Sequence, residues 1–185
     1  MSPLALAVST SGDVYFVEDN DPYGLWKITG GAGAAVQIGP YSEVPGPKGL
    51  FITPEGDVYV ADYGYSRVVK YTGGAGPYSV VGAFSEAMSV FVLEGDVYVC
   101  TSTLTNGVPS GGVYKQAGGL AAVQIITGVR CQSFFVVQND DQSRDIYLSS
   151  WGNNVLNPGI FKFSNEGGEP VQLSTAVSSG IGVVC

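Results

Sequence analysis

The sequence predicts an all-β protein made of similar four-stranded antiparallel sheets, and two observations support this prediction. The first is an internal repeat of about 45 residues, in which three separate markers recur with one period. The second is the composition, because 27 Gly and 10 Pro make up one residue in five of the 185. This is too many helix breakers for a helical bundle. Four short strands in each repeat of this length are typical of a β-propeller blade.

The three markers divide the chain into four repeat units. A Gly-Asp-Val-Tyr motif opens the second strand of each unit, a lysine after two apolar or aromatic residues marks the third strand, and a Gly-Gly pair follows the lysine. The motif occurs at Gly12–Tyr15, Gly56–Tyr59 and Gly95–Tyr98 and in altered form at Arg144–Tyr147, the lysines are Lys27, Lys70, Lys115 and Lys162, and the glycine pairs begin at Gly30, Gly73, Gly118 and Gly167.

Each unit contains four runs of β-branched and aromatic residues, bounded by Gly, Pro and Asp turns. In the second unit we expect strands over 49–53, 57–61, 67–72 and 78–81. The second strands are apolar on both faces, as expected for sheets that are covered on two sides. Leu4–Val8 matches the first strand of a unit, and Ile181–Val184 matches the first strand of a further one.

We therefore expect blades over about 3–46, 47–86, 87–130 and 131–179, with 180–185 as the first strand of a further blade. Four blades and one additional strand do not complete a ring, so we expect an incomplete propeller of the six-bladed type. A closed four-bladed ring and closure by a second chain are the alternatives. An open arc would expose apolar blade faces, which favours self-association.

The second unit resembles the NHL repeat. Pro47–Asp62 and Ser66–Val68 follow that family's pattern, which runs Pro-x-Gly-(apolar)3, then Gly-x-(apolar)-Tyr-Val-Ala-Asp, then Asn/Ser-Arg-(apolar). The other units keep the Asp-x-Tyr core but not the Ala-Asp and Arg positions. NHL-like propellers include lactonases, lyases and binding modules, so the resemblance implies the fold more than the function.

Composition excludes several functions. There is no histidine, which removes Ser-His-Asp and Cys-His catalysis and zinc sites with His ligands. A net charge of −8 disfavours nucleic acid as a partner, and no apolar run approaches the roughly 18 residues that span a membrane. Cys100 and Cys131 would lie on the same face in adjacent blades. We expect both to be buried free thiols, and a disulfide between them is the alternative.

The recurring charged residues have structural roles in our interpretation. The aspartates Asp13, Asp57, Asp96 and Asp145 belong to turns, where glycine supplies the positive φ. The lysines of the third strands are expected to pair with a carboxylate on their own or the next blade, with their aliphatic stems over apolar surface.

The loops after the second strands form the candidate binding face. They contain Tyr, Trp and Arg, which anchor interfaces, and propellers place function on such contiguous loops. We expect a protein or a small polar ligand to bind there without catalysis and without a required cofactor. The candidate residues are Asp19, Asp21, Tyr23, Tyr63, Tyr65, Arg67, Trp151, Asn153 and Asn154.

The alternative function is a divalent-metal-dependent hydrolase or lactonase. The NHL resemblance extends to gluconolactonase-like propellers, which bind a divalent metal through Glu, Asn and Asp near the central channel. Glu18, Asp19 and Asp62 are the candidate ligands for Ca²⁺ or another divalent cation, because such ions prefer oxygen ligands. The ligand motifs of that family do not align with this sequence residue by residue.

Overall fold

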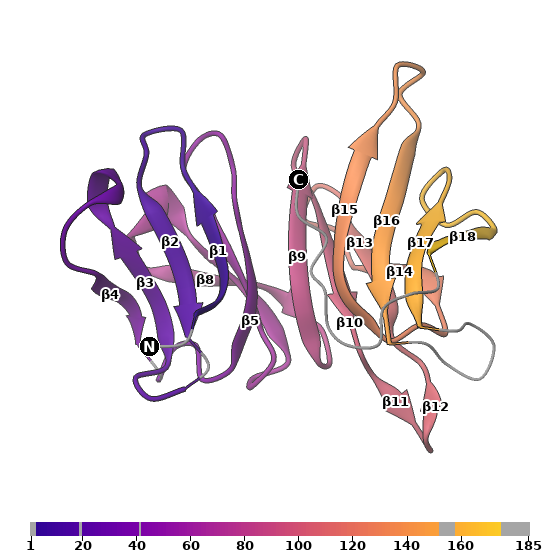
Figure 1. Cartoon of the computed structure of the whole chain (residues 1–185), viewed down its shortest axis with the longest axis horizontal. Coiled ribbons are helices and arrows are strands. Elements are labelled where there is room, and N and C mark those ends of the chain that lie inside the picture. The colour runs from indigo at the N-terminus through magenta and orange to yellow at the C-terminus, as the bar shows by residue number, and fades with distance from the viewer. Residues whose placement is uncertain (1–2, 19, 41, 152–157, 175–185) are drawn as a thin grey trace. The chain divides into compact units, whose positions relative to one another are not determined.

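The computed structural model describes residues 3–18, 20–40, 42–151 and 158–174 (Figure 1). Within these residues the protein is all-β, apart from two 3-10 turns, η1 (Thr29–Gly31) and η2 (Thr72–Gly74). The strands form four four-stranded antiparallel sheets and one two-stranded hairpin. The predicted all-β class is therefore confirmed. No helix in the described part is long and apolar enough to cross a membrane.

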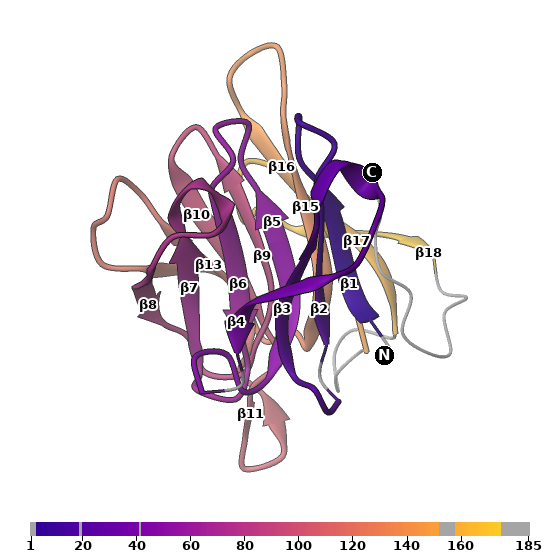
Figure 2. The same ribbon diagram turned by 90° about the vertical axis from the view of Figure 1, so that its left-hand side faces the viewer.

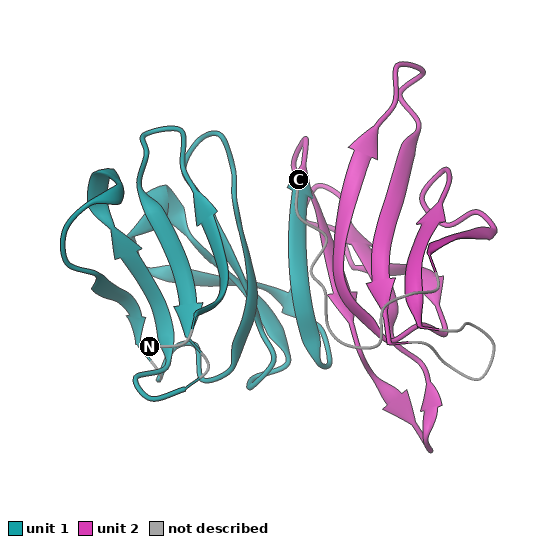
Figure 3. Cartoon of the chain, in the orientation of Figure 1, with its two compact units in different colours: residues 1–92 teal, residues 93–185 magenta. Residues whose placement is uncertain are grey.

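The chain divides into two compact units, residues 1–92 and 93–185 (Figure 3). Two consecutive sheets lie wholly within the first unit, and Figure 2 shows β5, β6 and β7 side by side. Their strands are β1 (Pro3–Val8), β2 (Val14–Glu18), β3 (Gly24–Ile28) and β4 (Val36–Pro40), followed by β5 (Pro47–Ile52), β6 (Val58–Asp62), β7 (Arg67–Tyr71) and β8 (Tyr78–Ala83).

The third and fourth sheets follow the same plan, and the division between the units falls within β9. Their orders are β14-β13-β10-β9 and β15-β16-β17-β18. The strands are β9 (Ala87–Leu93), β10 (Asp96–Thr101), β13 (Gly112–Gln116), β14 (Val123–Thr127), β15 (Cys131–Gln138), β16 (Arg144–Ser150), β17 (Gly159–Phe163) and β18 (Pro170–Ser174), and the hairpin is β11 (Leu104–Thr105) with β12 (Val108–Pro109). The strand expected over 180–185 lies outside the described residues.

Side chains from the first two sheets, together with Val44 of the connection between them, form the core of the first unit. They are Tyr15, Val17, Leu25, Val44, Val58, Val60, Val69 and Tyr71, each at most 3% exposed. The packing is close enough to require glycine at Gly74, where a β-carbon would overlap the hydroxyl of Tyr15. Gly74 also has a φ of +73°, which disfavours any residue with a side chain. This repeated turn is therefore fixed both by its backbone and by its neighbour.

The repeat motif forms the same polar contact in all four sheets. The motif tyrosine lies directly opposite the lysine of the next strand. The lysine ammonium reaches across this tyrosine ring, 5.1–5.7 Å from its centroid, to the motif aspartate. These ion pairs confirm that each lysine pairs with a carboxylate, here one of its own sheet, whereas Asp96 and Asp145 lie in strands and not in turns. The pairs are Lys27–Asp13 at 2.8 Å, Lys70–Asp57 at 2.5 Å, Lys115–Asp96 at 3.2 Å and Lys162–Asp145 at 2.7 Å.

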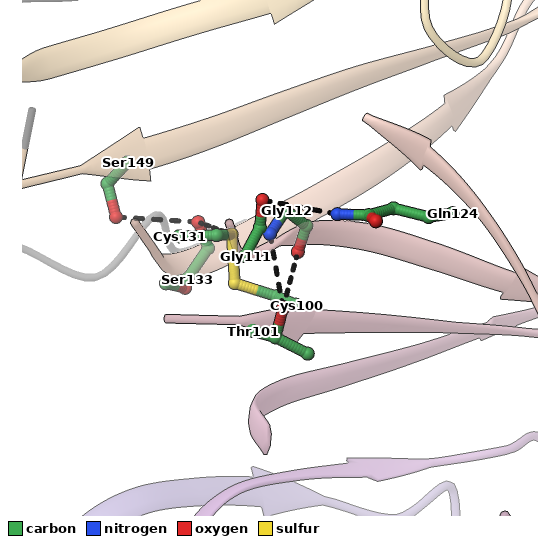
Figure 4. The surroundings of a disulfide bond; sticks show 8 residues. All are labelled: Cys100, Thr101, Gly111, Gly112, Gln124, Cys131, Ser133 and Ser149. Atoms are coloured by element: carbon green, nitrogen blue, oxygen red, sulfur yellow. Dashed lines mark hydrogen bonds between the residues drawn. A yellow bond between two sulfur atoms is a disulfide. The ribbon is translucent and has the colours of Figure 1, made fainter. Parts of the chain in front are cut away.

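The expectation of free thiols is wrong, because Cys100 and Cys131 form a disulfide (Figure 4). Cys100 lies at the end of β10 and Cys131 at the start of β15, and both are fully buried. Their Cα atoms are 5.6 Å apart, within the range that a disulfide spans. Beside the disulfide, the hydroxyl of Thr101 accepts a hydrogen bond from the backbone amide of Gly112 at 3.1 Å. The bond therefore joins the third sheet to the first strand of the fourth.

Candidate functional site

Two of the sequence-predicted residues, Asp62 and Arg67, form an ion pair in the first unit. Asp62 is fully buried at the end of β6, and its Oδ2 pairs with Nε of Arg67 at 3.1 Å. Its Oδ1 accepts the amides of Gly46 at 3.3 Å and Tyr65 at 3.4 Å. Arg67 also donates to the carbonyl of Glu43. The pair therefore ties the loop after β6 to the connection that leads into β5.

Cations stack on the exposed tyrosines of the same loop. The guanidinium of Arg67 lies 4.8 Å from the ring of Tyr65 and 5.2 Å from that of Tyr78, and the ammonium of Lys48 lies 5.9 Å from the ring of Tyr63. Tyr63 is 40% exposed and Tyr65 is 54% exposed. Both rings thus contact a cation while the two residues stay exposed to solvent.

The remaining predicted residues are distributed over both units. Asp21 is exposed and Tyr23 is half-buried, and both lie in the loop between β2 and β3. In the second unit Trp151 is 40% exposed, and the guanidinium of Arg130 lies 4.7 Å from its ring. The positions that fall outside the described residues are Asp19, Asn153 and Asn154.

The candidate metal ligands do not form a metal site among the described residues. Asp19 is outside them, and Glu18 is 1% exposed at the end of β2. Asp62 does not fit a divalent cation, because a guanidinium and two backbone N–H groups engage the oxygens that the cation would need. Among the described residues, no three Asp, Glu, Cys or His side chains lie together in a way that could hold a metal.

Sequence reasoning missed a pocket in the second unit, at the opposite end of β10 and β16 from the disulfide. It has a volume of about 510 Å³ and lies between the turns of the third and fourth sheets. Every side chain that lines it is polar or charged. The lining residues are Glu94, Asp96, Lys115, Gln138, Gln142, Ser143, Arg144, Asn165 and Glu166.

Arg144 is the centre of an ion-pair network on the wall of this pocket. Its Nη1 donates to Asp96 at 2.6 Å and to the hydroxyl of Tyr98 at 2.7 Å, and its Nη2 donates to Glu94 at 2.8 Å. Lys115 pairs with Glu166 at 2.7 Å, and Glu166 also accepts the hydroxyl of Tyr98. The network joins two β-sheets within one unit.

The network fixes the charge of its members. Burial alone would raise the pKa of Asp96, but its hydrogen bonds to Arg144 and Lys115 outweigh burial and hold that pKa below the usual value. The pKa of Glu166 is lowered against burial in the same way by Lys115 and Tyr98. Burial, followed by the contact with Glu166, raises the pKa of Tyr98 to about 12. At neutral pH these acids are therefore ionised and Tyr98 is neutral.

Departures from the internal repeat are the sequence signal that could have located this pocket. Asn165 and Glu166 follow Lys162 at the spacing at which Gly30 and Gly31 follow Lys27, so the equivalent pair is not at Gly167, as the repeat alignment placed it. Their φ values, 55° and 57°, match the 61° and 68° of the glycines. The left-handed turn is retained although its glycines are lost.

The second departure is Arg144, which precedes the motif aspartate in the fourth unit. Gly12, Gly56 and Gly95 occupy this place in the other three units. The change converts a turn glycine into the cation at the centre of the network. The altered motif of the fourth unit thus supplies one wall of the pocket.

The comparisons with known proteins bear on the fold. No protein-family model and no curated protein matches the sequence. Among solved structures, a gluconolactonase from Xanthomonas campestris is 13% identical with a TM-score of 0.68, over 88% of this chain and 58% of that one. Virginiamycin B lyase from Staphylococcus aureus is 16% identical with a TM-score of 0.61, over 95% and 56%. The chain has a propeller-type fold.

A catalytically inactive form of the same lyase with quinupristin gives a similar result, at 14% identity and a TM-score of 0.65 over 94% of this chain and 56% of that one. The chain thus spans a little more than half the length of these structures. At such identities the similarity describes the fold alone. The NHL-like character of the repeats stays a prediction.

Proposed function

We propose that the chain is part of a propeller enzyme that hydrolyses a small polar lactone or related cyclic ester. The fold similarity to a gluconolactonase over 88% of the chain supports the substrate class. This proposal favours the hydrolase alternative of the sequence analysis over a scaffold without catalysis. We derive no metal-dependent step, because Asp62, one of the described candidate ligands, is already engaged by Arg67 and two backbone amides.

Glu18 is the observation that carries the proposal. It ends β2 at the place where Asp62 ends β6, and both carboxylates are at most 1% exposed. A buried acid is costly to desolvate and is retained for a structural or a chemical reason. We assign a chemical role to Glu18, because it ends β2 next to the loop between β2 and β3, on the candidate binding face. Such a carboxylate can accept a proton from water as the water attacks an ester carbonyl.

An indicator assay of glucono-δ-lactone hydrolysis tests the proposal, with added Mg²⁺, Ca²⁺, Mn²⁺ or Zn²⁺ and with chelator. The intact chain should accelerate hydrolysis, and Glu18→Gln should lower kcat/KM by roughly 100-fold or more, as expected for loss of a catalytic base. Glu55→Gln, in an exposed turn of the second sheet, is the matched control. An unchanged rate in folded Glu18→Gln, or no acceleration under any condition, would contradict the proposal.

A binding scaffold is the second candidate, favoured by the exposed rings of Tyr63, Tyr65 and Trp151 with a cation against each. Tyr and Trp in this setting are typical interface anchors. The lactone assay separates the two candidates, because a folded chain without any turnover leaves the scaffold as the better explanation.

A further inference from the structure

The pocket in the second unit can be considered separately from the proposed hydrolase, because none of its lining residues belongs to the loop face that contains Glu18. Its volume of about 510 Å³ lies within the range of small-molecule sites, roughly 300–1,000 Å³. All of its lining side chains are polar or charged, so a ligand that forms hydrogen bonds complements it better than an apolar one. The ligand must be small and able to form hydrogen bonds.

The charges in the pocket argue against an anion and against a metal ion. Three carboxylates and two cations line it, which leaves a surplus of one negative charge, and the whole chain carries −8. Arg144 and Lys115 are already paired with these carboxylates, so neither offers a free charge to an anion. The same two cations engage the carboxylate oxygens that a divalent ion would need as ligands.

The acceptors that stay available belong to carboxylates. In the first two sheets, Oδ1 of the motif aspartate accepts a backbone amide, from Gly30 to Asp13 at 2.7 Å and from Gly73 to Asp57 at 2.9 Å. In the third sheet Arg144 and Lys115 both engage Oδ2 of Asp96, and no described group donates to its Oδ1.

Glu94 lies beside Asp96 in the preceding turn and leaves a second carboxylate oxygen open. Only its Oε2 is engaged, by Arg144, and its side chain is 59% exposed. The two open oxygens and the surplus charge call for a ligand that donates hydrogen bonds and carries positive charge. We propose that this pocket binds a small organic cation through an ammonium or guanidinium group, with the amide side chains of Gln138, Gln142 and Asn165 contacting the rest of the ligand.

The source of the cation can be a free polyamine or a basic side chain of a protein, and the probes distinguish them. Isothermal titration of the intact chain would use spermidine, N-acetyl-lysine methylamide and N-acetyl-arginine methylamide. The uncharged N-acetyl-norleucine methylamide and acetate are the controls. We expect at least one of the cations to bind saturably, and its affinity to weaken as the ionic strength rises from about 0.05 to 0.5 M. Neither control compound should bind.

Glu94→Gln is the variant that tests the site, since it removes the surplus charge and leaves Asp96, Lys115 and Arg144 in place. Because Glu94 is largely exposed, affinity should fall by about fivefold rather than be abolished. Glu55→Gln is the matched control, because its glutamate also precedes the Gly-Asp of its repeat, at a turn outside the pocket. The Glu55→Gln variant should bind the cation with the same affinity as the wild type.

Three results would each overturn the proposal. These are no binding of any of the cations, tighter binding of acetate or of the uncharged amide than of every cation, and an equal loss of affinity in the Glu94 and Glu55 variants. None of them bears on lactone hydrolysis, so this inference and the proposed function can fail separately.

Discussion

Removal of the Cys100–Cys131 disulfide should destabilise the second unit by several kcal/mol. The bond closes a loop with a sequence separation of 31, and loop-closure entropy for that length corresponds to about 3.7 kcal/mol at 25 °C. For a chain of this size, about 2–4 °C is lost for each kcal/mol, so the melting temperature should fall by about 7–15 °C. The bond is fully buried, so reductant should act slowly on the folded protein.

The assay is urea unfolding followed by circular dichroism, on the Cys100→Ala/Cys131→Ala double variant and on wild type with and without reductant. Comparing reduced with oxidised wild type isolates the cross-link from the lost side-chain volume. Cys185→Ala is the control for removal of a thiol. If reduced and oxidised wild type unfold at the same urea concentration, the cross-link does not stabilise the unit and the reasoning is refuted.

Three further predictions concern other parts of the chain. Gly73→Ala should lower the free energy of unfolding only by the penalty for a left-handed backbone, about 1 kcal/mol. Gly74→Ala should lower it clearly more, because the new β-carbon also meets the hydroxyl of Tyr15. Chemical denaturation of both variants checks this order. Because the pKa of Asp96 is lowered in the folded protein, its ionised form stabilises the fold above the usual pKa of 3.8, and this contribution is lost as pH falls below that value. The Asp96→Asn variant should therefore be less stable than wild type at pH 7 but lose less stability than wild type on acidification. Urea titrations at several pH values measure both differences. Leu6 is 66% exposed on β1, so Leu6→Ser should reduce concentration-dependent self-association in sedimentation velocity, and an unchanged profile would mean that this face does not associate.

Features that repeat along the sequence were predicted well. The strand expected over 67–72 is β7, Arg67–Tyr71, and the strand expected over 78–81 lies within β8, Tyr78–Ala83. The pairing of each third-strand lysine with a carboxylate was also foreseen, but its partner, the motif aspartate of the same sheet, was identified only by the structure. Such contacts depend on local register, which the alternation of side chains and the turn residues determine.

Features that depend on neighbouring sheets were predicted poorly. Whether Cys100 reaches Cys131 depends on how the end of one sheet meets the start of the next, and a separation of 31 residues carries no such information. Asp62 was a plausible metal ligand in the sequence. Only the structure shows that its carboxylate oxygens are already engaged by Arg67 and two backbone amides. A list of acidic residues cannot reveal which of them are already paired.

The turn at Asn165 and Glu166 shows why divergence within a repeat is informative. A left-handed conformation costs a non-glycine residue about 1 kcal/mol, and here two consecutive residues bear that cost while the equivalent turns of the other three units keep glycine. Glycine would relieve the turn without changing its backbone, so the fold alone does not explain the exchange. The carboxylate that it introduces reaches Lys115 and Tyr98 of the neighbouring sheet. Replacing Glu166 by glycine should therefore relax the turn yet remove the contacts of this carboxylate with Lys115 and Tyr98, while Arg144 still joins the two sheets. The constraint on this residue thus lies in the pocket and not in the turn.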